Sequence, residues 1–127
     1  MEKTVIRTES APAPFQGAPY NQAIRVGDLV FVAGQLGLKP GDTAVEGDVA
    51  VQTEQVMRNL AAILEAAGSS LANLVKTSVF LQDLGDFAAM NEVYARHVGD
   101  RPPARSTFEV AKLPSGALVE IEAVAHT

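Results

Sequence analysis

The pattern of hydrophobic and polar positions predicts six short strands. In each of them apolar residues alternate with polar ones or form a brief run bounded by Gly, Pro or Asp. The predicted strands are residues 3–8, 23–26, 29–33, 74–81, 105–110 and 118–125. Gly27-Asp28 predicts a hairpin turn between the second and third strands, and residues 112–116 predict a turn that joins the last two as another hairpin. Gly34 follows the third strand directly, which predicts a bulge or a close backbone approach.

Two segments show helical spacing instead. The first runs from Asp48, a good N-cap residue, to about Ala67, and the second runs from Asp86 to about Val98. Each is followed by a glycine, the usual residue at a helix C-terminus. The side chains predicted to face the sheet are Val56, Leu60, Ile63, Leu64 and Ala67 from the first helix and Phe87, Met90, Val93, Tyr94 and His97 from the second.

The order β-β-β-α-β-α-β-β predicts an α+β fold in one domain, residues 1–127, with both helices packed on one face of the sheet. Two helices cannot cover both faces of such a sheet. The strand 74–81 nonetheless has apolar residues on both faces: Leu74 and Phe80 on one, and Val75, Val79 and Leu81 on the other. The second face is therefore expected to pack on other copies of the chain, which predicts an oligomer.

The composition mainly argues against certain classes of protein. The net charge is −5 and the ten Lys and Arg residues are scattered, which argues against a nucleic-acid partner. There is no cysteine, and His97 and His126 lack the spacing of a metal site, so we expect no metal. No apolar run approaches the ~20 residues that span a bilayer, and the N-terminal residues lack the apolar core of a signal peptide. These features predict a cytoplasmic protein with no membrane segment.

The candidate chemistry lies near the C-terminus. Pro102-Pro103 stiffens the backbone before Arg105, and a fixed guanidinium is the preferred partner of a planar carboxylate. Glu120 lies on the next predicted strand, where a carboxylate can position or deprotonate a water. Strand periodicity also explains both residues as a solvated arginine and a polar strand face. The predicted hairpin keeps them in one region of the sheet without placing them in contact.

Several further residues have both a structural and a functional interpretation. Tyr20 ends a loop rich in Pro and Gly, and is either an anchoring aromatic or a pocket wall with a hydroxyl at its tip. Gly34 either makes a bulge or lets a bare N–H reach a ligand. Asn91 and Tyr94 are interpreted from the pattern as core or cap residues. Nucleophile-elbow, P-loop and GxGxxG patterns are absent from the sequence.

The order and spacing of several short segments make the chain similar to the Rid family, also called the YjgF family, of reactive-intermediate deaminases. The resemblance covers nearly the whole chain. It is carried by Gly17-Ala18-Pro19-Tyr20, Phe31-Val32-Ala33-Gly34-Gln35, Gln52-Thr53-Glu54-Gln55 with Asn59-Leu60, Val75-Lys76-Thr77, Asp86-Phe87, Met90-Asn91-Glu92-Val93-Tyr94, Pro103-Ala104-Arg105-Ser106 and Ile121-Glu122-Ala123.

The resemblance implies a chorismate-mutase-like fold and a homotrimer whose three active sites lie between subunits. It also implies hydrolysis of 2-imino acids and their enamine tautomers to 2-keto acids and ammonia. The substrates it implies are 2-aminoacrylate, 2-iminobutanoate and 2-iminopropanoate. Neither a metal nor another cofactor is expected.

The resemblance also assigns roles to single residues. By position, Arg105 resembles the clamp for the substrate carboxylate and Glu120 the residue that orients the attacking water. Tyr20 resembles a pocket wall, and Gly34 and Thr107 resemble backbone contacts to substrate or water.

Three further positions bear on the match to the active site of this family. Asn91 matches a family position near the pocket. Ala33 stands where many of these deaminases have serine, so one pocket hydroxyl is missing. Thr107 stands where some members have cysteine, a change that a backbone contact would tolerate. Substrate range and rate are what these differences affect.

Two alternatives to the deaminase stay open at this stage. One is a non-catalytic regulatory trimer that uses Arg105 to bind a small carboxylate, to which Ala33 gives some weight. The other is a ribonuclease or translation inhibitor, a label often given to this family. The acidic charge and the absence of a histidine pair argue against that second alternative.

Overall fold

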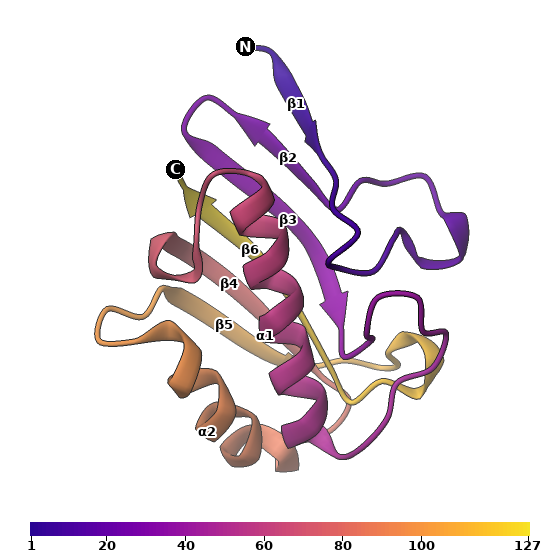
Figure 1. Ribbon diagram of the computed structural model, residues 1–127. Helices are drawn as coiled ribbons and strands as arrows, with labels where there is room; N and C mark the ends of the chain where they lie inside the picture. The colour runs from indigo at the N-terminus through magenta and orange to yellow at the C-terminus, as the bar shows by residue number, and fades with distance from the viewer.

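Residues 1–127, the whole chain, are described by a computed structural model, in which six strands form one sheet (Figure 1). The strand order across the sheet is β1-β2-β3-β6-β4-β5. Strands β4 and β5 are parallel, and all other neighbours are antiparallel. The strands are β1 (Lys3–Ile6), β2 (Ala23–Val26), β3 (Leu29–Leu36), β4 (Leu74–Leu81), β5 (Ala104–Glu109) and β6 (Val119–His126).

The two helices, α1 (Val49–Ala66) and α2 (Phe87–Val98), lie side by side on one face of the sheet (Figure 1). Between them and the sheet lies one main core of 22 buried residues. Its largest fully buried side chains include Met57, Leu60, Ile63 and Leu64 of α1. The predicted α+β fold with both helices on one face is therefore confirmed. Neither helix is both long and apolar enough to cross a membrane.

Local signals set the helix ends, with one exception. The Asp48 side chain accepts a hydrogen bond from the Val51 N–H at 3.0 Å, as an N-cap should. Asp86 precedes α2, but its side chain makes no capping hydrogen bond, so the prediction of a cap there is wrong. A short 3-10 turn leads directly into α2, and Asp83 caps that turn by accepting from the Gly85 N–H at 2.7 Å.

The inner face of α2 differs from the prediction at its two ends. Met90, Val93 and Tyr94 are buried as expected, and Val98 joins them. Phe87 is 42% exposed because it begins the helix at the margin of the core. His97 is only partly buried and pairs with α1 rather than with the sheet.

The prediction for strand β4 is confirmed for Val79 and Leu81, which are buried together in the core, but it is wrong for Leu74 and Val75. The register between β4 and β6 shifts between Leu74 and Lys76. This bulge adds one residue to the strand, so Leu74 lies on the same side as Val79 in the core. Val75 is left 46% exposed.

The predicted hairpin of the last two strands is also wrong. Strand β5 pairs in parallel with β4, and β6 pairs with β4 from the other side, so β4 lies between β5 and β6. The physical reason is that α2 connects β4 to β5, and a helical crossover allows two strands to run in parallel. Strand β6 then fills the place between β3 and β4.

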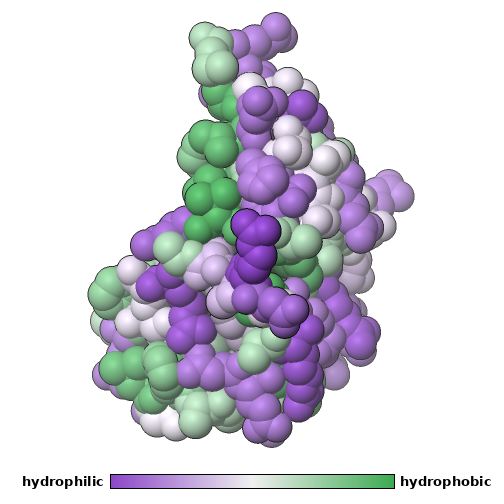
Figure 2. Space-filling model, turned by 90° about the vertical axis from the view of Figure 1, so that its left-hand side faces the viewer, coloured by the Kyte–Doolittle hydropathy of each residue, from purple (hydrophilic) through white to green (hydrophobic).

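The sheet face opposite the helices carries an apolar row that the chain leaves open. The row crosses four neighbouring strands through Val5, Ile24, Phe31 and Val124, each the register partner of the next. Figure 2 shows hydrophobic side chains gathered along the left-hand edge of the upper half of the molecule, on the side away from the helices. Contact with other copies of the chain stays a prediction for this face, and the exposed row is the feature that supports it.

Candidate active site

Arg105 lies on the helix face of the sheet, at its β5 edge. In the parallel register it is the partner of Thr77, which is fully buried beneath the helices. Its guanidinium carbon lies 4.9 Å from the centre of the Tyr94 ring and 5.5 Å from that of Phe87. Both rings belong to α2, and both distances are within the range of a cation–π contact. The cation is therefore held between β5 and the helix.

Tyr94 is itself firmly fixed. Its side chain is only 5% exposed, and its hydroxyl lies 2.7 Å from the hydroxyl of Thr77. Burial raises the pKa of the Tyr94 phenol, and the Thr77 hydrogen bond and the Arg105 charge oppose that rise. The ring beside Arg105 is therefore a neutral phenol at physiological pH.

Glu120 lies on the opposite face of the sheet from Arg105. Its neighbours along β6, Val119 and Ile121, are buried under the helices, so the alternation of the strand directs Glu120 to the open face. Burial raises the pKa of the Glu120 carboxyl, and the nearby negative charge of Glu122 raises it further. No hydrogen bond stabilises the ionised form, so this carboxylate is a stronger base than an ordinary glutamate.

Gly34 provides the space in which the Glu120 carboxylate lies. A Cβ at position 34 would be 2.2 Å from Oε2 of Glu120. The predicted bulge is confirmed here, because the register between β3 and β6 shifts between Val32 and Gln35. Ala33 belongs to the same bulge, where its N–H donates to the Gln22 carbonyl at 2.9 Å. Its methyl group offers no hydrogen bond to a ligand.

Tyr20 belongs to the same side of the site as Gly34. The two residues line a small hollow of about 30 Å³ together with Phe15 and Leu36, and a hollow of that size can accommodate a single water. The Tyr20 hydroxyl accepts a hydrogen bond from the Phe15 N–H, which fixes the ring against its own loop. The structure thus brings Tyr20, Gly34 and Glu120 into one group.

Asn91 and Thr107 belong to the other group, with Arg105. Asn91 lies one turn from both Phe87 and Tyr94 on α2, on the face that borders Arg105. Its Oδ1 atom is buried and has no hydrogen-bond partner within the chain, so it can accept a hydrogen bond from a group outside the chain. Thr107 is partly buried and shares the Arg105 face two residues further along β5.

A single chain therefore does not assemble the predicted site. Arg105, Asn91 and Thr107 lie on the helix face at one edge of the sheet, and Glu120 lies on the open face near Gly34. The two halves are complementary in chemistry, because one offers a fixed cation and the other a partnerless carboxylate. Within one chain the sheet itself separates them.

The sequence reasoning missed Phe87 and Tyr94 as neighbours of Arg105. It placed both on the inner face of α2, which is correct for Tyr94 alone. Nothing in the spacing links them to a strand that comes later in the chain, because that contact depends on the parallel pairing of β4 and β5. One signal in the sequence could have pointed to these neighbours of Arg105: Phe87 and Tyr94 both lie in segments that carry the family resemblance.

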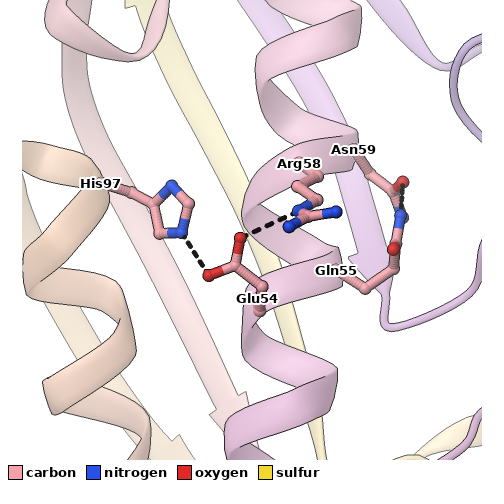
Figure 3. A network of polar contacts seen from close by, with 5 residues as sticks. All are labelled: Glu54, Gln55, Arg58, Asn59 and His97. Atoms are coloured by element: carbon pink, nitrogen blue, oxygen red, sulfur yellow. Dashed lines mark hydrogen bonds and ion pairs between the residues drawn. The ribbon is translucent and has the colours of Figure 1, made fainter.

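Helix α1 supports both halves through polar side chains (Figure 3). Asn59 is fully buried and donates to the carbonyls of Leu36 at 3.1 Å and Leu38 at 2.8 Å, at the end of β3. Figure 3 shows Glu54 between its two partners, with Oε1 2.8 Å from Nε2 of His97 and Oε2 2.9 Å from Nε of Arg58. The bond to His97 ties α1 to α2, the helix that carries Tyr94.

The remaining hollows and charged groups do not add to this site. A hollow of about 490 Å³ lies between α1 and α2, and another of about 640 Å³ lies beside the N-terminal loop; neither is lined by Arg105 or Glu120. No group of three or more His, Cys, Asp or Glu side chains has the arrangement of a metal site.

Comparison with known proteins gives a consistent result along the chain. The family model described as endoribonuclease L-PSP matches residues 8–127. A RutC family protein of Pyrococcus abyssi is 50% identical over 127 residues, which cover 99% of this chain and 98% of that protein. Reactive Intermediate Deaminase A, chloroplastic, of Arabidopsis thaliana is 46% identical over 126 residues, which cover 98% of this chain and 66% of that protein.

The likeness extends to solved structures. The crystal structure of RidA from an Antarctic Psychrobacter bacterium matches with a TM-score of 0.93 at 43% identity, covering 98% of this chain and 99% of that one. The crystal structure of the YjgF gene product from E. coli matches with a TM-score of 0.88 at 42% identity, covering 97% and 98%. The chorismate-mutase-like fold that the family resemblance implied is therefore confirmed.

Proposed function

Since the chain belongs to the Rid family, we propose that it hydrolyses reactive 2-imino acids and their enamine tautomers to 2-keto acids and ammonia. The observation that carries the proposal is the Glu120 carboxylate. It is partly buried, its pKa is raised, and no group of the chain donates a hydrogen bond to it. A base in that condition is suited to take a proton from water.

The proposed reaction needs few protein groups. Arg105 binds the carboxylate of the substrate with charge-assisted hydrogen bonds, each worth about 1.5–3 kcal/mol. Protonation of the imine nitrogen makes C2 strongly electrophilic, and water adds to C2 while Glu120 accepts a proton from it. Glu120 then returns that proton to the nitrogen of the C2 carbinolamine. As the C–N bond breaks, the hydroxyl proton passes to Glu120 and the C2–O bond becomes the carbonyl of the 2-keto acid. The released ammonia takes the proton from Glu120 and leaves as ammonium. A general base contributes a rate factor of about 10²–10⁴ to such a step.

We propose that the complete site forms between subunits of a homotrimer. Arg105 and Glu120 lie on opposite faces of the sheet of one chain, so a substrate that contacts both requires a second copy. The apolar row Val5, Ile24, Phe31 and Val124 offers the contact surface. In this arrangement Arg105, Asn91 and Thr107 of one chain meet Tyr20, Gly34 and Glu120 of its neighbour.

The proposed substrates are small, namely 2-aminoacrylate, 2-iminobutanoate and 2-iminopropanoate. The 46% identity to Reactive Intermediate Deaminase A supports this class of substrate. Ala33 offers no hydroxyl to the pocket, so recognition depends on the Arg105 clamp and backbone groups. The strength of these contacts is expected to set the relative kcat/KM for each imine.

A second candidate function is the binding of a small carboxylate without catalysis. The observation that favours it is that the Arg105 half of the site is complete within one chain, held by Phe87 and Tyr94. Saturable binding of 2-ketobutyrate that depends on Arg105, with no acceleration of imine hydrolysis, would establish this function instead.

The word endoribonuclease in the description of the family model points to a third activity. The residues here do not favour it, since the net charge is −5 and the two histidines lie in separate contacts. His97 pairs with Glu54, and His126 contacts the carbonyl of its neighbour Thr127. RNA cleavage that persists through purification and is lost in Glu120→Gln would reverse this judgement.

The direct test couples the purified protein to a threonine dehydratase, which releases the imine as a transient product. The wild-type protein is expected to accelerate 2-ketobutyrate formation while the imine is present. Arg105→Ala and Glu120→Gln are each expected to abolish the acceleration. Wild-type acceleration by either variant would show that the assigned site is wrong.

A further inference from the structure

We propose that Tyr94, tethered by Thr77, is the positioning residue that orients Arg105 for carboxylate binding. The inference rests on the proposed function of Arg105 and adds to it the group that fixes the clamp. Tyr94 acts through Arg105, because its own hydroxyl is already engaged with Thr77 at 2.7 Å inside the protein.

The geometry is a triangle of three elements. Tyr94 comes from α2, Thr77 from β4 and Arg105 from β5. Thr77 and Arg105 are register partners in the parallel pair, so a side chain fixed to Thr77 is also fixed beside Arg105. The guanidinium carbon lies 4.9 Å from the Tyr94 ring centre, closer than the 5.5 Å to Phe87.

The two aromatic contacts are not equivalent. Phe87 is 42% exposed and has no polar atom to anchor it, so its ring is held by fewer contacts than that of Tyr94. Tyr94 is in the main core and its hydroxyl is bonded to a side chain that is itself fully buried. Tyr94 is therefore the more firmly held of the two rings that contact this cation.

A firmly held ring matters because a free arginine side chain samples many rotamers and loses them on binding. Contact with a fixed ring removes part of that loss before the substrate arrives, which increases affinity without a new contact to the substrate. A guanidinium has five N–H donors, so its contact with Tyr94 leaves donors available for a carboxylate. The expected consequence is a role in substrate binding and none in the chemical step.

The test begins with Tyr94→Leu, which removes the ring. We expect KM for the transient imine to rise about tenfold with kcat within about twofold of wild type, as for loss of one partly buried cation–π contact. The same loss is expected in the Kd for 2-ketobutyrate measured by calorimetry. Val93→Ala truncates another buried residue of α2 and is the matched control, with the wild-type KM expected.

A second variant separates positioning from folding. Tyr94→Phe combined with Thr77→Val keeps the ring and the packing volume but removes the tether, and replacing both partners of a buried hydrogen bond is nearly neutral for stability. We expect KM to rise by about two- to threefold, less than in Tyr94→Leu, because the ring stays but is no longer held. An unchanged KM in this double variant would overturn the role of the tether.

The Nε–Hε NMR resonance of Arg105 gives a readout that does not depend on activity. A proton over an aromatic face is shifted upfield by the ring current, so we expect this resonance upfield of the other arginines in the wild type and near them in Tyr94→Leu. A resonance that is unchanged in Tyr94→Leu overturns the proposal even if the protein is an active deaminase. A wild type without deaminase activity that still shows the shifted resonance refutes the proposed function and supports the positioning.

Discussion

Replacing Gly34 by alanine moves the Glu120 carboxylate and little else. The added Cβ would lie 2.2 Å from Oε2 and 2.9 Å from Cδ of Glu120, whereas ordinary contact begins at 3.4 Å. The nearer oxygen must therefore withdraw by about 1.2 Å, the difference between these distances. Gly34 is not among the glycines with positive φ, so the substitution adds no backbone strain.

The expected result is a loss of rate with little loss of stability. The atoms that must move are the end of a flexible side chain, so Tm should stay within about 2 °C of wild type. A displacement of about 1 Å in a catalytic group costs about 10²-fold in kcat, whereas KM should hold because Arg105 is untouched. The assay is the coupled dehydratase reaction at several imine fluxes, with Tm from calorimetry.

Gly37→Ala is the matched control, because its Cβ would meet backbone rather than a side-chain end. It would lie 2.8 Å from Cα and 2.9 Å from the carbonyl oxygen of Gln52 in α1. Such overpacking costs about 1–3 kcal/mol of stability, so Tm should fall clearly. If Gly34→Ala keeps wild-type kcat, or loses stability as Gly37→Ala does, the role given to the space at Gly34 is refuted.

Three further predictions concern pH. Because the pKa of Glu120 is raised, the acidic limb of the pH profile of kcat should lie above the range of an ordinary glutamate. Glu122→Gln removes the neighbouring negative charge and should move that limb to lower pH. A limb that does not move would show that the Glu122 charge does not raise the pKa of Glu120. The raised pKa also means that ionised Glu120 destabilises the fold at pH values above its folded-state pKa. Glu120→Gln should therefore raise Tm at pH 8. It should not raise Tm at pH 3, where the Glu120 carboxyl is protonated in both the folded and the unfolded state. The pKa of Glu54 is lowered, first by the hydrogen bond with His97, so the ionised Glu54 stabilises the fold above the unfolded-state pKa, and this stabilisation is lost as the pH falls through the folded-state pKa. Glu54→Gln should therefore lower Tm at pH 7, and the difference from wild type should shrink steadily as calorimetric scans are taken to lower pH; a constant difference would contradict this cause.

The sequence was sufficient for the elements that depend on local signals. The ends of helix α1 were predictable because their signals are local: the Asp48 carboxylate caps its first turn, and Gly68, with positive φ, lies just after its last turn. The bulge at Gly34 was predictable for the same reason. Periodicity also identified the face of α1 that packs on the sheet, since Val56, Leu60 and Ile63 recur at helical spacing and are all buried in the core.

The errors concern pairing between distant segments. Whether β5 pairs with β4 or with β6 depends on the crossover through α2, which no turn residue signals. The bulge that turns Leu74 inward involves no glycine or proline, so period-two counting placed it on the wrong face. The candidate residues were found by resemblance, but their division between two faces follows from this pairing and required the structure.

The central claim is that Arg105 of one chain works with Glu120 of another, and mixed assembly tests it directly. Arg105→Ala and Glu120→Gln chains are denatured together in equal amounts, refolded, and assayed for accelerated imine hydrolysis. Each variant refolded alone should be inactive. In the mixture, random association joins an intact Arg105 to an intact Glu120 in one site out of four, so about a quarter of the wild-type activity per chain should return. If the mixture stays as inactive as the separate variants although mixed oligomers form, the shared site is contradicted.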